Sequence, residues 1–420
     1  MNTRILITIR EMVMIGVDRD GMLSLNGIIV LLLCALFCQP LVAQDAANPA
    51  RLYADSTNAL YNLDFSTAQH GYEALTRTYP ENPDYWNALA SSLWLKITYD
   101  QQKLNIESFS GKASFGTKES KEGVSPEDEK RLRDTVVIAM AKAQAILDKN
   151  PNDVHALYAL GIAHATMASF ESTVKRSYLT AHSRAKTARN LHQQVLKLDP
   201  NFDDARLSVG TYDYVIGVIP AFFRYLLAPL GVRSAGKDAG IRELETAAAK
   251  GKLASTDARM VLTVVYVREK KYDEALKLIN DLHGKYPRNF LFELAKGSIY
   301  GKMMKVDDAV HVYEDVLAKV HAKKDGYERL REARVYSLLG NANIDRMQFE
   351  KAGEEFGHVV TSRDATEDEK GSAYLWMGKI YDSKKDRTSA VKQYDLLLGL
   401  DCDPDLKAEA QKYKRRPYGT

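Results

Sequence analysis

The sequence predicts an all-α protein: a right-handed α-solenoid of about eight helix hairpins, with two insertions and a C-terminal capping helix. The first observation is a pattern of apolar residues at helical spacing that recurs from residue 49 to about residue 402. The second is composition, because only 12 prolines in 420 residues and 27% charged residues favour helix. The third is that no segment reads convincingly as a β-strand. The length therefore counts repeated units rather than globular domains.

The clearest copy of the pattern shows how one hairpin is built. Leu262 and Tyr266 recur at helical spacing in its first half, and Ala275 and Leu282 do so in its second half. Pro287 then ends the second helix. We expect two antiparallel helices here, and because so short a pair cannot bury a core alone, we expect the pairs to stack.

One position of the second helix holds a small residue in all eight copies. Where two helices approach to about 8 Å, their backbones leave no room for a larger side chain. An aromatic or large apolar residue follows four positions later in six copies, and Ala143 and His192 are the exceptions. The small residues are Ala68, Ala139, Ala188, Gly240, Ala275, Ala309, Ala352 and Ala390.

The repeated pattern resembles the tetratricopeptide repeat, in which Leu-Gly and Tyr mark the first helix, and Ala, an aromatic residue and Pro mark the second. The last copy carries Gly378, Tyr381, Ala390 and Tyr394 in these places. The resemblance implies a concave groove lined by the second, fifth, ninth and twelfth residues of each first helix. The Lys and Asn clamp that some members use for a terminal carboxylate is missing, which disfavours a receptor for chaperone tails.

Carried onto this chain, those places predict an apolar groove that binds a protein segment. Structural burial is the alternative for each lining residue. The predicted partner-binding residues are Tyr158, Ile162, Leu207, Tyr214, Met260, Val264, Val267, Leu294 and Asn341.

The N-terminus predicts export. Residues 1–44 read as a signal peptide, with an uncharged apolar core from Gly27 to Phe37 and small residues near Ala43. The whole apolar run is about 17 residues, the short limit for crossing a bilayer, so an uncleaved anchor is the alternative. We expect a periplasmic protein, or a membrane-tethered one if the segment stays.

Two insertions interrupt the pattern. The first, residues 98–131, is a polar loop rich in Ser, Gly and Lys that is either disordered or lines the neighbouring groove. The second, residues 215–230, is an apolar hairpin that either packs into the solenoid's core or docks on a partner or a membrane surface. The docking residues would be Phe222, Phe223, Tyr225 and Leu226.

These features divide the chain into five parts. They are a signal peptide (1–44), N-terminal hairpins (45–202), a divergent hairpin (203–255), C-terminal hairpins (256–402), and a capping helix with a tail (403–420).

No motif in the sequence carries catalysis or metal binding. The nine histidines show no metal-binding spacing, and Cys402 has no histidine nearby. A net charge of +3 without a basic block gives no sign of nucleic-acid binding. We therefore expect no enzyme, no metal and no cofactor, and a protein partner, with membrane contact only through the N-terminal segment or the 215–230 hairpin.

The predicted function is a non-enzymatic protein–protein interaction scaffold of the cell envelope that binds a partner segment in its groove. The alternative is an envelope assembly factor anchored in the inner membrane by the uncleaved N-terminal helix.

Overall fold

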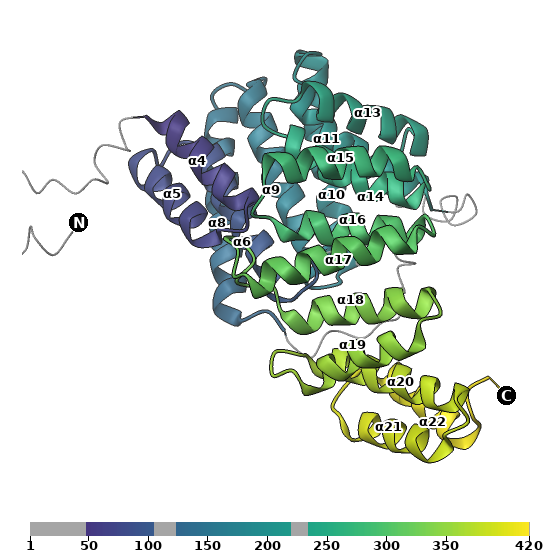
Figure 1. Ribbon diagram of the computed structural model, residues 1–420. Coiled ribbons are helices and arrows are strands. Elements are labelled where there is room, and N and C mark those ends of the chain that lie inside the picture. The colour runs from purple at the N-terminus through teal and green to yellow at the C-terminus, as the bar shows by residue number, and fades with distance from the viewer. Residues whose placement is uncertain (1–47, 105–122, 220–233, 420) are drawn as a thin grey trace, which may run out of the picture. The chain divides into compact units, whose positions relative to one another are not determined.

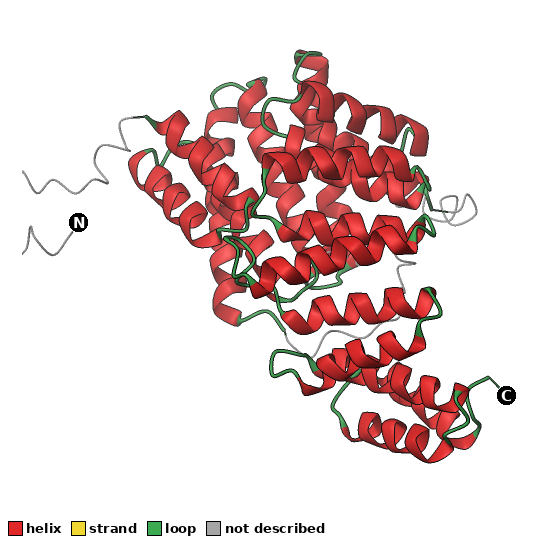
Figure 2. Cartoon of the chain, viewed as in Figure 1, coloured by secondary structure: helices red, strands yellow, loops and turns green. Residues whose placement is uncertain are grey.

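The computed structural model describes residues 48–104, 123–219 and 234–419 (Figure 1). The chain divides into two compact units, Met1–Asp55 and Ser56–Thr420. Of the first unit, the described residues form only the beginning of helix α4, and the description below concerns the second. All secondary structure in the described ranges is helical, as Figure 2 shows.

The described helices follow one another as eight pairs and a final single helix, which confirms the all-α solenoid. The pairs are α4 (Pro49–Tyr61) and α5 (Phe65–Thr78), α6 (Pro83–Asp100) and α8 (Pro126–Leu147), α9 (Val154–Thr173) and α10 (Tyr178–Leu198), α11 (Arg206–Gly217) and α13 (Lys237–Lys250), α14 (Ser255–Arg268) and α15 (Tyr272–Lys285), α16 (Phe290–Lys302) and α17 (Val306–His321), α18 (Glu332–Asp345) and α19 (Phe349–Thr361), and α20 (Glu367–Ser383) and α21 (Arg387–Gly399). Helix α22 (Pro404–Arg415) follows the last pair, and a 3₁₀ turn, η1 (Asp203–Ala205), precedes α11.

The small position of the second helix is buried in every hairpin, as the sequence predicts. The alanines from Ala68 to Ala390 at this position are almost fully buried. At Gly240 even a methyl group is excluded, because an added Cβ would lie 2.4 Å from the backbone nitrogen of Tyr214. Close helix approach within each pair therefore sets the residue size there.

A glycine of the first helix faces the aromatic residue of the second. A Cβ added at Gly297 would lie 2.4 Å from the Tyr313 ring, and one added at Gly378 would lie 2.3 Å from the Tyr394 ring. His192, which replaces the aromatic residue in the third hairpin, also faces a glycine. A Cβ added at Gly161 would lie 2.2 Å from the His192 imidazole. His192 thus fills the place of the aromatic ring.

Short side-chain caps start the first helices after the Pro-x-Asn and Pro-x-Asp turns. The carboxamide oxygen of Asn82 accepts a hydrogen bond from the Asp84 backbone N–H at 2.9 Å, and Asn289 caps α16 in the same way through Leu291 at 3.1 Å. The Asp153 carboxylate caps α9. Each cap satisfies one of the backbone donors that a helix leaves unpaired at its start.

The insertions are only partly described. Helix α6 continues to Asp100 and α8 begins at Pro126 after its cap Ser125, so both ends of the 98–131 segment are helical or close to helix. Residues 215–217 belong to α11. The signal segment 1–44, residues 105–122 and the docking residues Phe222, Phe223, Tyr225 and Leu226 lie outside the described residues. Among the helices that are described, none is both long and apolar enough to span a membrane.

Candidate functional site

The nine predicted partner-binding residues differ widely in exposure. Tyr158, Tyr214, Val267 and Leu294 are buried, whereas Asn341 is exposed. The other four are half-buried apolar residues: Ile162, Leu207, Met260 and Val264. Only the half-buried and exposed side chains can meet a partner without a change in the hairpins.

The buried tyrosines have structural partners. The Tyr158 ring stacks on the His192 imidazole with centroids 5.0 Å apart, and its carbonyl oxygen accepts a hydrogen bond from His192 Nε2 at 3.1 Å. The Tyr214 hydroxyl donates to the Glu269 carboxylate at 3.0 Å, and burial together with this contact raises the pKa of Tyr214 to about 12. For these two residues, the alternative of structural burial describes the structure.

The structure brings Leu207, Met260 and Val264 together. They pack against one contiguous apolar cluster formed chiefly by α13, α14, α15 and α16, to which Tyr214 of α11 and Val267 also belong. On α14, Met260 and Val264 are four residues apart and therefore lie on one face of the helix. We call Leu207, Met260 and Val264 the inner row. Leu294 and Asn341 are not part of this cluster.

The same lining positions are closed at the second and third hairpins, because α6 packs directly on α9. The Asn87 side chain donates to the Ala159 carbonyl at 2.8 Å, Ser91 contacts Thr166 at 3.3 Å, and the Trp94 indole N–H donates to Thr173 at 3.1 Å. Asn87 is buried. Polar side chains at these places therefore join neighbouring hairpins instead of facing a partner.

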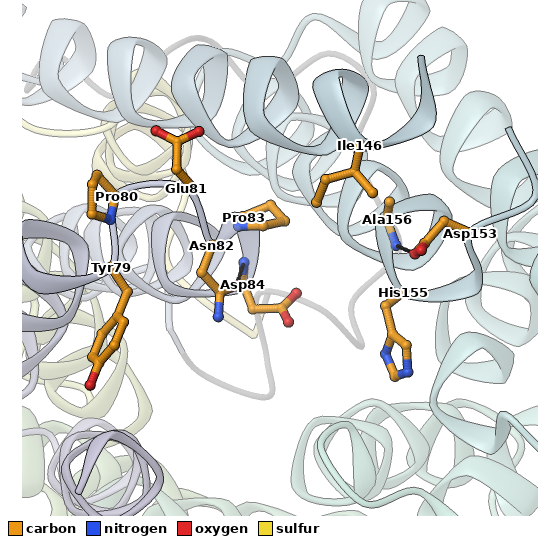
Figure 3. A pocket seen from close by; sticks show the side chains of 10 residues that line it. All are labelled: Tyr79, Pro80, Glu81, Asn82, Pro83, Asp84, Ile146, Asp153, His155 and Ala156. Carbon is orange, nitrogen blue, oxygen red and sulfur yellow. Dashed lines mark hydrogen bonds between the residues drawn. The ribbon is translucent and has the colours of Figure 1, made fainter. Parts of the chain in front are cut away.

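A pocket of about 570 Å³ lies where α6 and α9 begin (Figure 3). The Asp84 side chain of α6 and the His155 side chain of α9 both line it, while Glu81 points away and pairs with Lys142 at 2.7 Å. Burial raises the pKa of the half-buried Asp84 carboxyl, and nearby His155 opposes that shift. The remaining lining includes apolar side chains of Pro83 and Ile146, so the pocket offers apolar contact beside a carboxylate.

Sequence reasoning missed one contact at the inner row. The Tyr61 hydroxyl donates a hydrogen bond to the Asp257 carboxylate at 2.8 Å, although the two residues are 196 positions apart. Asp257 lies three residues before Met260, on the same face of α14. Burial raises the pKa of the Asp257 carboxyl to about 6, and the Tyr61 hydrogen bond opposes the shift. The sequence identifies the surrounding turns only as helix starts, so no local signal marks this pair.

The described residues contain no group of three or more His, Cys, Asp or Glu side chains that could hold a metal ion. Cys402 is buried, and burial raises the pKa of its thiol, which disfavours the reactive thiolate form. The expected absence of cofactors stays a prediction.

Solved structures similar to the chain include several helical repeat proteins. Yeast Tom70 is 14% identical, with 88% of each chain covered and a TM-score of 0.36. Human IFIT1, solved as a dimer with m7Gppp-AAAA, is 13% identical, with 89% of this chain and 88% of that chain covered and a TM-score of 0.42. A tetratricopeptide repeat protein from Parabacteroides merdae is 17% identical, with 78% and 98% covered and a TM-score of 0.30.

Two family models match the sequence, whereas no curated protein matches it. A Tetratricopeptide repeat model matches residues 53–101. The model described as Iml2/Tetratricopeptide repeat protein 39 matches residues 140–363, a little more than half of the chain. The architecture is that of a protein-interaction scaffold, and the chain belongs to the Iml2/Tetratricopeptide repeat protein 39 family.

Proposed function

We propose that the chain is a non-enzymatic scaffold of the cell envelope that binds a segment of a protein partner along the inner row. The observation that carries the proposal is the inner row itself. Leu207, Met260 and Val264 come from two successive first helices, belong with one apolar cluster, and keep part of their surface exposed.

A row of this kind suits an extended or helical segment that presents apolar side chains at regular spacing. Such segments bind in grooves mainly through shape and apolar contact, and a few anchor residues supply most of the affinity. The partly exposed Met260 is well suited to an anchor pocket because its unbranched side chain adapts to different neighbours.

Affinity capture from envelope extracts tests the proposal. Met260→Asp and Val264→Asp place a charge on the inner row, and we expect each to abolish recovery of a partner that the parent chain retains. Val137→Asp is the matched control, because Val137 is 63% exposed on α8 and tolerates a charge. Tyr214→Asp is less informative, since Tyr214 is only 3% exposed and a buried charge would disturb the fold. Retention of the partner by both inner-row variants, in folded protein, would refute groove binding.

The envelope location rests on residues 1–44, whose apolar core and small-residue end suit a cleaved signal peptide. The mass of the mature protein tests it. A chain that starts near Ala43 supports release into the periplasm. A chain that keeps Gly27 to Ala43 instead supports the alternative, an assembly factor anchored in the inner membrane.

A further inference from the structure

Two turns that are far apart in the sequence are joined at one end of the inner row. The turn of residues 62–64 follows α4, whose last residue is Tyr61, and the turn of residues 286–289 connects α15 with α16. We call their contact the clasp. In an array where each hairpin touches only its neighbours, the first and fifth hairpins would not meet.

Two asparagines hold the clasp reciprocally. The Asn62 carboxamide oxygen accepts a hydrogen bond from the Arg288 backbone N–H at 3.1 Å. The Asn289 carboxamide in turn donates to the Tyr61 carbonyl oxygen at 2.8 Å. Both asparagines are buried. Each side chain therefore supplies the hydrogen bond that water would otherwise make with a backbone group on the opposite side of the contact.

Tyr61 connects the clasp with the inner row. Its ring packs on the Tyr286 ring with centroids 5.0 Å apart, and its hydroxyl reaches Asp257 on α14. Tyr61 also belongs to the apolar cluster against which Met260 and Val264 pack. On the face of α14 that carries the inner row, Tyr61 therefore already occupies the place next to Asp257.

Further contacts support the clasp on either side. Arg288 forms an ion pair with Asp64 at 3.5 Å. The Arg331 guanidinium donates to Gln102, which follows α6, and the Tyr99 ring packs near Phe290 with centroids 6.4 Å apart. The contact is thus a built interface with complementary donors, acceptors and rings.

We propose that the clasp is an autoinhibitory contact, in which Tyr61 covers the Asp257 end of the inner row, Asn62 holds it there, and a partner segment occupying the whole row displaces both. The proposal rests on the proposed function, because it concerns access to the same row. A segment that lies along α14 past Met260 meets Tyr61 next, since Asp257 and Met260 are three residues apart on one face. Opening of the clasp frees the Asp257 carboxylate and the Tyr286 ring for that segment.

Thiol labelling of the full chain tests the proposal without a partner. The natural cysteines Cys34, Cys38 and Cys402 are first replaced, and Met260→Cys is then introduced as the single thiol. Fluorescein maleimide is the labelling reagent. We expect Tyr61→Phe combined with Asn62→Ala to raise the labelling rate about tenfold, because residue 260 is only partly exposed while the clasp is closed and its full access follows the population of the open form. Tyr61→Phe alone, which removes only the hydroxyl, gives a smaller rise and serves if the double variant does not fold.

Two controls separate opening of the clasp from general loosening. Asp386→Ala removes the cap of α21, a comparable side-chain-to-backbone hydrogen bond in the last hairpin, and leaves labelling at Met260→Cys unchanged. A probe at Ser337→Cys on α18 reacts equally fast with the clasp intact or weakened. The Arg288 backbone N–H donates a hydrogen bond to the Asn62 carboxamide oxygen. Its hydrogen-exchange rate therefore reports whether the clasp has opened.

The proposal is overturned if the Arg288 amide exchanges faster in the double variant while the labelling rate of Met260→Cys stays unchanged. The maleimide would then reach the inner row as easily with the clasp closed as with it open. An Arg288 amide that exchanges no faster in the double variant overturns it as well, since the two side chains then do not hold the contact. Because no partner is involved, either outcome leaves the capture experiment with Met260→Asp as a separate test of the proposed function.

Discussion

His192 shows how one residue can keep the packing of a repeat and change its chemistry. It takes the position that Tyr313, Phe356 and Tyr394 take in other hairpins, and it is fully buried against Tyr158. Burial lowers the pKa of His192 to about 4. The imidazole is therefore neutral in the folded protein at neutral pH.

This shift predicts acid sensitivity. An unfolded histidine titrates near 6.5, so between that pH and about 4 the unfolded chain binds the proton that folded His192 excludes. Stability from this residue is complete above pH 6.5 and falls as the pH is lowered towards 4. We expect the parent chain to lose about 2 kcal/mol more than His192→Phe between neutral pH and about pH 5.

Chemical denaturation of parent and variant at both pH values measures this difference. The comparison cancels other titrating groups such as Asp257, whose raised pKa acts in the opposite direction. Equal losses in parent and variant would show that His192 becomes protonated without unfolding.

Two glycines of α16 test the packing of the first helix against the aromatic residue. In Gly297→Ala the new methyl group collides with the Tyr313 ring, which we expect to cost about 1–3 kcal/mol of unfolding free energy. Gly301→Ala is the matched control, since nothing lies within 4 Å of its Cβ position and alanine is favoured over glycine in a helix by about 0.5–1 kcal/mol. Thermal or chemical denaturation should therefore show opposite signs for the two variants. A Gly297→Ala variant as stable as Gly301→Ala would mean that the Tyr313 ring moves aside freely.

At the scale of elements, the turns inside the hairpins repeat one left-handed geometry without glycine. Lys270, Met304, Met347 and Lys385 all have φ near +60°. The residue after each donates its backbone N–H to a carbonyl five residues earlier, as Lys305 does to Tyr300 at 3.0 Å. This is the Schellman ending of an α-helix, for which glycine is the favoured residue.

Glycine should therefore stabilise these turns. Met304 and Met347 are 79% and 76% exposed, so their side chains add little packing, and we expect Met304→Gly or Met347→Gly to raise the unfolding free energy by about 0.5–1 kcal/mol. Met303→Gly is the control, because Met303 has φ −79° and packs against the core, so its loss should destabilise. Denaturation midpoints would measure both. If Met304→Gly is less stable than the parent chain, the relief of backbone strain at this positive φ is smaller than the conformational entropy that glycine adds to the unfolded chain. That result would contradict the prediction.

At the scale of the whole molecule, the C-terminal helix closes the core of the last hairpin. The Glu409 carboxylate of α22 forms an ion pair with the buried Lys379 ammonium at 2.8 Å, and Ala410 packs into the apolar cluster of α20 and α21. The Lys379 ammonium also lies 4.4 Å from the Trp376 ring and 5.3 Å from that of Tyr413. Removal of α22 leaves this lysine without its carboxylate.

A chain ending at Asp403 should lose stability locally. In a repeat array the stability is approximately a sum over hairpins and their interfaces, so we expect faster hydrogen exchange in α20 and α21 and unchanged exchange in α16 and α17. Mass spectrometry of peptic fragments measures both regions. Faster exchange throughout the described hairpins would show that the array unfolds as a single unit.

The repeated hairpins follow from the sequence alone, because their signals are local. Helical spacing, the small residue at Ala275 and its equivalents, and the turn before Asn289 act within one hairpin or between neighbours, where a short pattern is sufficient. The same local reasoning found Met260 and Val264 as surface candidates and could not separate them from the buried Tyr214.

Which lining positions are closed, and where distant hairpins meet, depends on how the hairpins pack in space. Contact between α6 and α9 buries Asn87, and Tyr61 reaches Asp257 across 196 residues. Each depends on the rotation between successive hairpins, which many side chains set at once, and for the contact of Tyr61 with Asp257 these rotations accumulate along the chain. No single residue pattern encodes such a sum, and for that reason the clasp appears only when the hairpins are placed in space.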